Sequence, residues 1–244
     1  MMQGRASVTT TKNMNIAIDI EKARFNMVEQ QIRTCEVLDQ DILDLLSQVK
    51  REEFVPAAYR PLAFVDMEIP LAHGAQGAAQ QQTMMAPKQE ARIMQELAVQ
   101  KHESVLEIGA GSGYLTALLA TCAKKVVSIE IFPEFSQVAS RNLQHAGISN
   151  TVLKVGDAAQ AQPALIGIER YDVIVLTGST PVLPKGFLDA LNPGGRLFAV
   201  VGDAPVMKAM LFTKAASASI AAAELFETVL TPLINAQQPQ RFEF

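Results

Sequence analysis

A glycine-rich turn is the feature of this sequence that points most directly to chemistry. Residues 105–114 read VLEIGAGSGY, so a short apolar run leads into Gly109, Gly111 and Gly113. Glycines let the backbone turn tightly and let a ligand approach it closely. A dinucleotide site of the G-x-G-x-x-G type would place a glycine at position 114, where this chain has Tyr114. The pattern therefore indicates a ligand other than a dinucleotide, and a turn without any ligand is the alternative.

Two acidic residues follow the turn where similar apolar runs end. Glu130 lies 21 residues after Gly109 (130 − 109), and its carboxylate can accept hydrogen bonds from both hydroxyls of a ribose. Asp157 follows Gly156 at the end of the next run, where an acceptor can meet the exocyclic amine of adenine. The alternatives are an acidic helix cap for Glu130 and a simple turn for Asp157. Because the carboxyl ends of parallel strands share one edge of a sheet, the three features together predict a nucleoside-type cofactor site.

Short apolar runs alternate with helical patterns from residue 104 onward. The predicted strands cover Ser104–Ile108, Val126–Ile129, Val152–Val155, Tyr171–Leu176 and Arg196–Val201. The predicted helices cover Tyr114–Thr121, Pro133–His145 and Pro184–Leu191. Strands that alternate with helices are typical of a parallel sheet that is covered on both faces. The sequence therefore predicts a doubly wound, mostly parallel α/β sheet, which Val206–Lys214 and Ile220–Leu230 complete at one edge as an antiparallel pair.

The first hundred residues are expected to hold helices and a long irregular segment. One helix should cover residues 19–34, and a second should follow Asp39, where apolar residues recur at helical spacing. Residues 61–88 are rich in Pro and Gly and are predicted to be irregular, up to a helix that starts at Pro87 and runs to about residue 99. The expected organisation is a disordered leader at 1–13 and a single domain at 14–244. Within it, residues 19–100 supply N-terminal helices and a substrate lid, and residues 104–233 supply the cofactor-binding sheet.

Composition and charge argue against several classes of partner. The 244 residues are 49% hydrophobic with a net charge of −4, and no basic stripe with interleaved aromatic residues suggests a nucleic-acid surface. No spacing typical of metal ligands occurs, and no apolar run is long enough to cross a membrane. The two cysteines, Cys35 and Cys122, are predicted to be reduced and mostly buried. We therefore expect a cytoplasmic protein with no metal, nucleic-acid or membrane partner.

The series of motifs resembles class I S-adenosylmethionine-dependent methyltransferases, with EIGAGSGY at 107–114, SIE at 128–130 and VGD at 155–157. The flanking segments resemble the protein-L-isoaspartate O-methyltransferases in order and spacing: MVEQQIR (27–33), REEFVP (51–56), IPLAHG (69–74), LNPGGRL (191–197) and TPL (231–233). This likeness spans about residues 24–233. It implies methyl transfer from S-adenosylmethionine, with S-adenosylhomocysteine as product, to the isoaspartyl carboxylate of damaged proteins, which is a repair reaction. Its implied partners are proteins or peptides that bear isoaspartate.

The resemblance also implies roles for individual residues. The turn from Gly109 to Gly113 would hold the methionine part of the cofactor, Glu130 its ribose, and Asp157 with Ala158 its adenine. Glu107 would lie near the methionine amino group. The implied cofactor site as a whole consists of Glu107, Gly109, Ala110, Gly111, Ser112, Gly113, Glu130, Ile131, Gly156, Asp157 and Ala158.

The segment after the fourth strand bears on the kind of methyl acceptor. Amine methylation of bases calls for an Asn-Pro-Pro-Tyr-type segment there, whereas this chain has TGSTP at 177–181. Its small residues are predicted to line the floor of the cofactor pocket. A carboxylate acceptor is already ionised near neutral pH, so no general base is required. The sequence accordingly assigns no catalytic residue.

The implied lid differs from the family pattern at the positions where the family has hydrogen-bonding side chains. The family usually carries Thr-Ile-Ser-Gln-Pro just before the cofactor motif, and this chain has TMMAP at 83–87. The implied substrate-binding residues are His73, Gly74, Thr83, Met84, Met85 and Ala86. A thioether cannot donate a hydrogen bond to a carboxylate, so the two methionines either shape an apolar pocket or pack within the protein. The alternatives to isoaspartyl methylation are a related methyltransferase with a different acceptor and a non-catalytic cofactor-binding protein.

Overall fold

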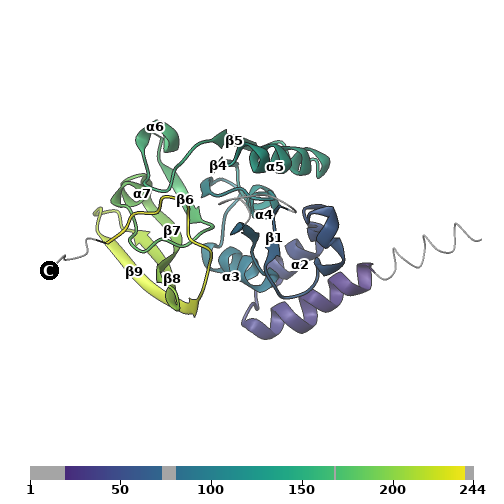
Figure 1. The fold of residues 1–244 in the computed structure, drawn as a ribbon. Coiled ribbons are helices and arrows are strands. Elements are labelled where there is room, and N and C mark those ends of the chain that lie inside the picture. The colour runs from purple at the N-terminus through teal and green to yellow at the C-terminus, as the bar shows by residue number, and fades with distance from the viewer. Residues whose placement is uncertain (1–19, 73–80, 168, 240–244) are drawn as a thin grey trace, which may run out of the picture.

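A seven-stranded sheet forms the centre of the protein in a computed structural model that describes residues 20–72, 81–167 and 169–239 (Figure 1). The strand order is β5-β4-β3-β6-β7-β8-β9. Strands β3 to β7 pair in parallel, and β8 pairs antiparallel with both β7 and β9. The bounds are β3 Ser104–Ile108, β4 Lys125–Glu130, β5 Thr151–Val155, β6 Tyr171–Leu176, β7 Leu191–Asp203, β8 Val206–Lys214 and β9 Ile220–Thr228. The predicted doubly wound fold and its antiparallel edge are confirmed.

Helices cover both faces of the parallel strands, because alternate side chains of each strand point to opposite faces. Val105 and Val173 belong to a core cluster under one set of helices, whereas Leu106 and Ile174 belong to a cluster under the other set. The first set comprises α2 Gln40–Gln48, α3 Pro87–Leu97, α4 Tyr114–Cys122 and α5 Pro133–His145, and the second comprises α6 Pro163–Ile166 and α7 Lys185–Asp189. This layering leaves the carboxyl ends of β3, β4 and β5 free to form a site.

The N-terminal region contains more regular structure than its sequence predicts. Residues 20–26 are α-helical and continue as a π-helix, η1 Met27–Ile32, and a 3-10 turn, η2 Arg33–Cys35. Asp39 caps α2 as predicted, since its side chain accepts a hydrogen bond from the Asp41 amide at 2.9 Å. The segment predicted as irregular contains η4 Ala57–Leu62 at its start and a small antiparallel sheet of β1 Ile69–Pro70 and β2 Thr83–Met84. The prediction that residues 61–88 are irregular was therefore wrong where β1 pairs with β2 and where η4 extends to Leu62.

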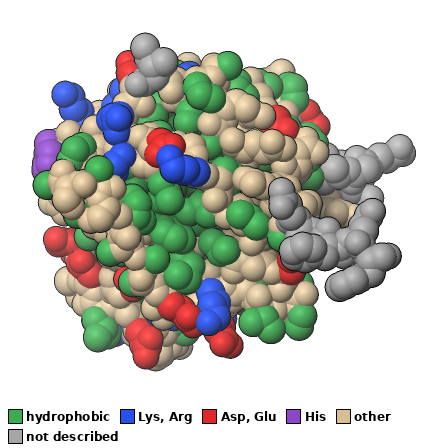
Figure 2. Space-filling view, turned by 90° about the vertical axis from the view of Figure 1, so that its left-hand side faces the viewer, with side chains coloured by type: hydrophobic (Ala, Val, Ile, Leu, Met, Phe, Trp, Pro, Cys, Tyr) green, Lys and Arg blue, Asp and Glu red, His purple; other side chains and the backbone are tan. Residues whose placement is uncertain are grey.

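The other end of the sheet differs from prediction in the length of β7. The strand begins at Leu191, before the predicted strand Arg196–Val201, so Pro193-Gly194-Gly195 lies inside it. Its pairing with β6 shifts register between Tyr171 and Val173. Figure 2 shows the face formed by this end of the sheet, where hydrophobic side chains gather between charged ones. An ion pair between Lys208 and Glu224, 2.7 Å long, joins β8 to β9 on the exposed side. The predicted leader at 1–13 lies outside the described residues.

Candidate active site

A cleft of about 850 Å³, including the part open to solvent, lies at the carboxyl ends of β3, β4, β5 and β6. This is the edge at which doubly wound sheets bind ligands. Twelve of the residues predicted from the sequence line it: Thr83, Met84, Met85, Gly109, Ala110, Gly111, Ser112, Glu130, Ile131, Gly156, Asp157 and Ala158. The structure thus brings most of the predicted cofactor residues and three of the predicted lid residues to one cavity.

Three of the other predicted residues lie outside the cleft wall. Gly113 is the N-cap of α4, and a Cβ there would meet Ala139 of α5 at 3.1–3.3 Å, so this glycine serves helix packing. Ala86 is buried and precedes α3 without lining the cleft. Glu107 lies below the glycine turn, outside the cleft wall. His73 and Gly74 lie outside the described residues.

The glycine turn has a backbone conformation that side chains would disrupt. Gly109 has a φ of +99°, and a Cβ at this position would lie 2.2 Å from the hydroxyl of Thr177. Gly111 has a φ of +52° and faces Leu71 across the cleft. The Thr177 hydroxyl donates to the carbonyls of Ile108 and Gly109, both at 2.8 Å, which fixes the turn against the end of β6. The sequence therefore needs glycine here both for the left-handed conformation and for the close contact.

Glu130 is the last residue of β4, and backbone amides of the neighbouring loops fix the orientation of its carboxylate. Its Oε2 accepts a hydrogen bond from the Gly111 amide at 2.9 Å, and its Oε1 accepts one from the Phe132 amide at 3.0 Å. Burial raises the pKa of Glu130, whereas the backbone amides oppose that rise by stabilising the charged form. A carboxylate has about four lone-pair sites, so these two bonds leave acceptor capacity for a ligand diol. The geometry fits the ribose role that the sequence predicts.

Glu107 is a fully buried carboxylate that joins three elements under the turn. Its Oε2 accepts hydrogen bonds from Thr116 of α4 at 2.5 Å and from Ser128 of β4 at 2.6 Å. Within the described residues, its Oε1 has no hydrogen-bond partner. Burial raises the pKa of Glu107 to about 8, against the effect of the two hydroxyls. An unpartnered buried acceptor of this kind is consistent with a cationic ligand group nearby.

Asp157 connects the cleft to the C-terminal segment. Its Oδ1 accepts from the Ala159 amide at 3.1 Å, and its Oδ2 accepts from the side-chain amide of Asn235 at 2.8 Å. Residues 230–234 of the same segment line the cleft, and Leu233 packs so closely on Gly178 that a Cβ there would meet it at 2.8 Å. Of the residues at 177–181 predicted for the pocket floor, Thr177 and Gly178 line the cleft, whereas Ser179 and Thr180 are fully buried outside its wall.

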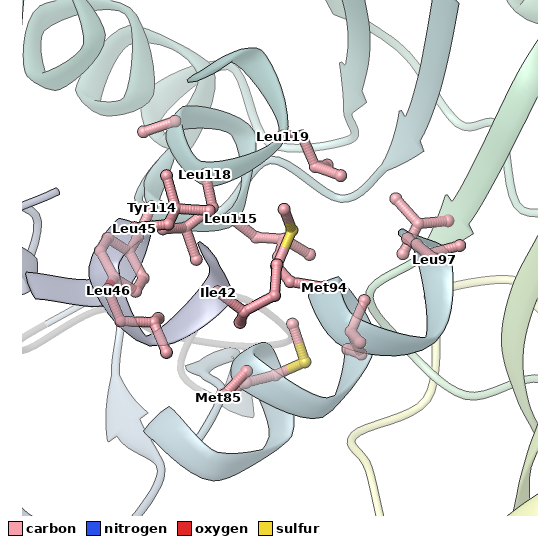
Figure 3. Close-up of a cluster of buried hydrophobic side chains, with 14 of the residues drawn as sticks. Ile42, Leu45, Leu46, Met85, Met94, Leu97, Tyr114, Leu115, Leu118 and Leu119 are labelled. Carbon is pink, nitrogen blue, oxygen red and sulfur yellow. The ribbon is translucent and has the colours of Figure 1, made fainter. Parts of the chain in front are cut away.

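The two lid methionines are largely core residues. Met84 is 4% exposed and Met85 is 6% exposed, and both belong to the hydrophobic cluster between the helices and the sheet. Figure 3 shows Met85 in one cluster of buried hydrophobic side chains with Ile42 of α2 and Met94 of α3. Only a small remainder of each side chain contributes to the cleft wall. The structure therefore favours the packing interpretation of these methionines over an apolar substrate pocket.

A buried ion pair holds the lid end in place. Arg51 is fully buried, forms an ion pair with Glu90 of α3, and donates to the backbone carbonyls of Met85 at 2.7 Å and Ala63 at 3.0 Å. Its guanidinium lies 5.1 Å from the ring centre of Tyr114, the first residue of α4. Burial raises the pKa of Glu90 to about 7, although Arg51 opposes the rise.

Sequence reasoning missed part of the cleft wall. These residues come from the lid edge, from α3 to α5 and from the C-terminal segment: Leu71, Gln82, Glu90, Tyr114, Leu115, Phe135, Ala159, Leu230, Thr231, Pro232, Leu233 and Ile234. The TPL segment at 231–233 was noted only as a likeness in sequence, and no local signal placed it against the lid. Across the described residues, no group of three or more His, Cys, Asp or Glu side chains could hold a metal ion. No helix in this part of the chain has the length and apolar character to cross a bilayer.

The sheet order, the glycine turn and the two acids at successive strand ends define an S-adenosylmethionine-dependent methyltransferase of Rossmann-like fold. Over residues 22–238 the sequence matches the family Protein-L-isoaspartate(D-aspartate) O-methyltransferase (PCMT), and the chain belongs to that family. This membership confirms the predicted enzyme class and methyl donor. The roles of individual residues remain predictions.

Curated relatives agree with this assignment, and a solved structure shares the fold. The chain is 38% identical over 181 residues to the protein-L-isoaspartate O-methyltransferase of Methanoculleus marisnigri, covering 74% of this chain and 78% of that protein. It is 33% identical over 218 residues to the Aeropyrum pernix enzyme, covering 88% and 80% of the two chains. Its fold is similar, with a TM-score of 0.72 at 19% identity, to the Plasmodium falciparum protein-L-isoaspartate O-methyltransferase solved with S-adenosyl-L-homocysteine. That superposition covers 86% of this chain and 97% of the other.

Proposed function

We propose that this protein transfers a methyl group from S-adenosylmethionine to the isoaspartyl carboxylate of damaged proteins and peptides, and so takes part in protein repair. The observation that carries the proposal is family membership over residues 22–238, combined with one cleft that contains both the cofactor motifs and the described part of the lid. A cytoplasmic location remains a prediction.

The residues of the cleft fit the proposed cofactor. Glu130 keeps free acceptor sites beside the turn, and Asp157 lies at the end of β5 for the adenine amine. Behind the cleft wall, Glu107 has an oxygen without a hydrogen-bond partner among the described residues. When bound, S-adenosylmethionine supplies an electrophilic methyl group on a sulfonium. The protein contributes orientation and exclusion of water, because an in-line displacement depends on how the two reactants are held. An ionised acceptor carboxylate needs no general base.

The alternative with a different acceptor depended on the two lid methionines forming an apolar pocket. Because both are more than nine-tenths buried in the core, their side chains offer little surface for a substrate. The remaining alternative, a cofactor-binding protein without catalysis, is separated from the proposal by direct measurement of turnover.

The test is methyl transfer from labelled S-adenosylmethionine to an isoaspartyl peptide, with the same peptide carrying normal aspartate as the comparison. We expect label in the isoaspartyl peptide alone. Glu130→Ala is the matched variant: it removes the proposed ribose acceptor, and we expect a loss of cofactor binding by calorimetry together with a loss of turnover. Cofactor binding without methylation of either peptide would refute the proposed substrate and favour one of the two alternatives.

A further inference from the structure

We propose that Thr231 donates the hydrogen bond that holds the acceptor carboxylate in the cleft. Thr231 lies on the C-terminal segment and is half-buried in the cleft wall, next to the lid strand β2. This inference rests on the proposed function, because it assigns a residue to recognition of the proposed acceptor group.

The charges of the cleft make a neutral donor necessary. An ionised carboxylate can only accept hydrogen bonds, so it requires donors from the protein. The described residues of the cleft wall include three carboxylates, Glu90, Glu130 and Asp157, and no lysine or arginine. An acceptor carboxylate therefore has no cation to pair with in this wall. Hydroxyl, amide or backbone N–H groups must bind it, at a distance from the three acids.

Most of the side-chain hydroxyls in the cleft are already committed or enclosed. The Thr177 hydroxyl donates to two backbone carbonyls of the glycine turn. The Thr83 hydroxyl donates to Glu68 at 2.9 Å, which directs its proton away from the cleft. Ser112 and Tyr114 are 4% and 1% exposed, so they offer little surface to a substrate.

The hydroxyl of Thr231 is the available one. Within the described residues its contact is with the Thr83 hydroxyl at 3.5 Å, which is at the outer limit for a hydrogen bond. Since Thr83 directs its own proton to Glu68, Thr83 can serve Thr231 only as a distant acceptor. A substrate carboxylate at normal hydrogen-bond distance would therefore be a better partner for the Thr231 proton.

The backbone around Thr231 is fixed, so the donor is already positioned. Ser179, which is fully buried after β6, donates its amide to the Thr231 carbonyl at 3.0 Å and accepts from the Leu233 amide at 2.9 Å. Its hydroxyl donates to the Leu230 carbonyl at 2.8 Å. Three hydrogen bonds from one buried residue thus hold the segment on both sides of Thr231. A donor fixed in this way loses little conformational freedom when it binds a substrate.

The test compares Thr231→Val, which keeps the shape and removes the hydroxyl, with Thr231→Ser, which keeps the hydroxyl. We expect Thr231→Val to raise KM for an isoaspartyl peptide and to weaken its binding to the S-adenosylhomocysteine-saturated protein by roughly 10- to 100-fold, the effect of one hydrogen bond to a charged group. Thr231→Ser should restore most of both. Thr228→Val is the matched control, because Thr228 is a half-buried threonine that bonds Gln89 outside the cleft.

The outcomes separate this inference from the proposed function. Affinity for S-adenosylhomocysteine, measured by calorimetry, should be the same in all four proteins and shows that each variant is folded. If the wild type methylates the peptide and Thr231→Val leaves both KM and peptide binding unchanged, the inference is overturned and the proposed function stands. If the wild type neither binds nor methylates the peptide, both are overturned.

Discussion

Replacement of Met85 by serine separates two views of the lid. If position 85 faced the substrate, Met85→Ser would supply a hydroxyl donor and raise turnover. In the structure the Met85 side chain is 6% exposed and belongs to the same buried cluster as Ile42 and Met94 (Figure 3). We therefore expect the variant to lose stability and to gain no turnover per folded molecule.

The expected loss follows from that packing. Truncation of a buried methionine to alanine costs about 2–5 kcal/mol. A buried serine hydroxyl without a partner adds about 1–3 kcal/mol. The free energy of unfolding should therefore fall by at least about 3 kcal/mol, a large share of the roughly 5–15 kcal/mol typical of a folded domain. Met85→Leu, which keeps most of the volume, should cost less than about 1.5 kcal/mol.

Urea unfolding of the wild type and both variants measures these differences, and turnover is measured under conditions where each protein is folded. A cost below about 1 kcal/mol for Met85→Ser, together with higher turnover on the isoaspartyl peptide, would refute the reasoning. That result would mean that the Met85 side chain faces the acceptor.

Two further predictions concern buried charges. Burial raises the pKa of Glu107 from its ordinary value of 4.5 to about 8, so its contribution to stability is full below pH 4.5 and is lost as the pH rises through 8. Glu107→Gln should flatten the pH dependence of the free energy of unfolding in this window, and an unchanged profile would contradict the assignment. Arg51→Met alone should lower the free energy of unfolding by about 3–5 kcal/mol, because it leaves Glu90 buried and unpaired. Adding Glu90→Leu should recover part of that loss. A double variant no more stable than the single one in urea unfolding would contradict this reasoning.

The cofactor half of the cleft could be predicted from the sequence because its signals are local. Each of Gly109, Glu130 and Asp157 directly follows or ends an apolar run, and parallel strands bring such positions to one edge of the sheet. The sheet itself was predictable for the same reason, since short apolar runs alternate with helical patterns. The errors in β7 and in the small β1–β2 sheet occur where glycines and prolines indicate turns but tertiary pairing decides the outcome.

The acceptor half could not be predicted because its contacts join distant parts of the chain. Thr83 and Thr231 are 148 residues apart in sequence and 3.5 Å apart in space. The direction of the Met85 side chain depends on its packing with α2 and α3. Comparing the sequence at position 85 with the serine of the family pattern therefore does not show whether this side chain faces the cleft. Sequence alone shows which functional groups are present in such a region, and only packing shows which of them face the cleft.

The buried Arg51 provides a physical link between the two halves. Its guanidinium bonds the Met85 carbonyl at the lid end and pairs with Glu90 of α3, and it also lies against the ring of Tyr114, which directly follows the glycine turn. Because the Arg51 side chain both holds the lid end and contacts the residue after the glycine turn, the lid end and the turn cannot change conformation independently. The stability cost expected for Arg51→Met should therefore be accompanied by weaker cofactor binding, even though Arg51 does not line the cleft. If Arg51→Met weakened binding of the acceptor peptide but not of the cofactor, Glu107 and Thr177 would be shown to hold the glycine turn without help from the lid.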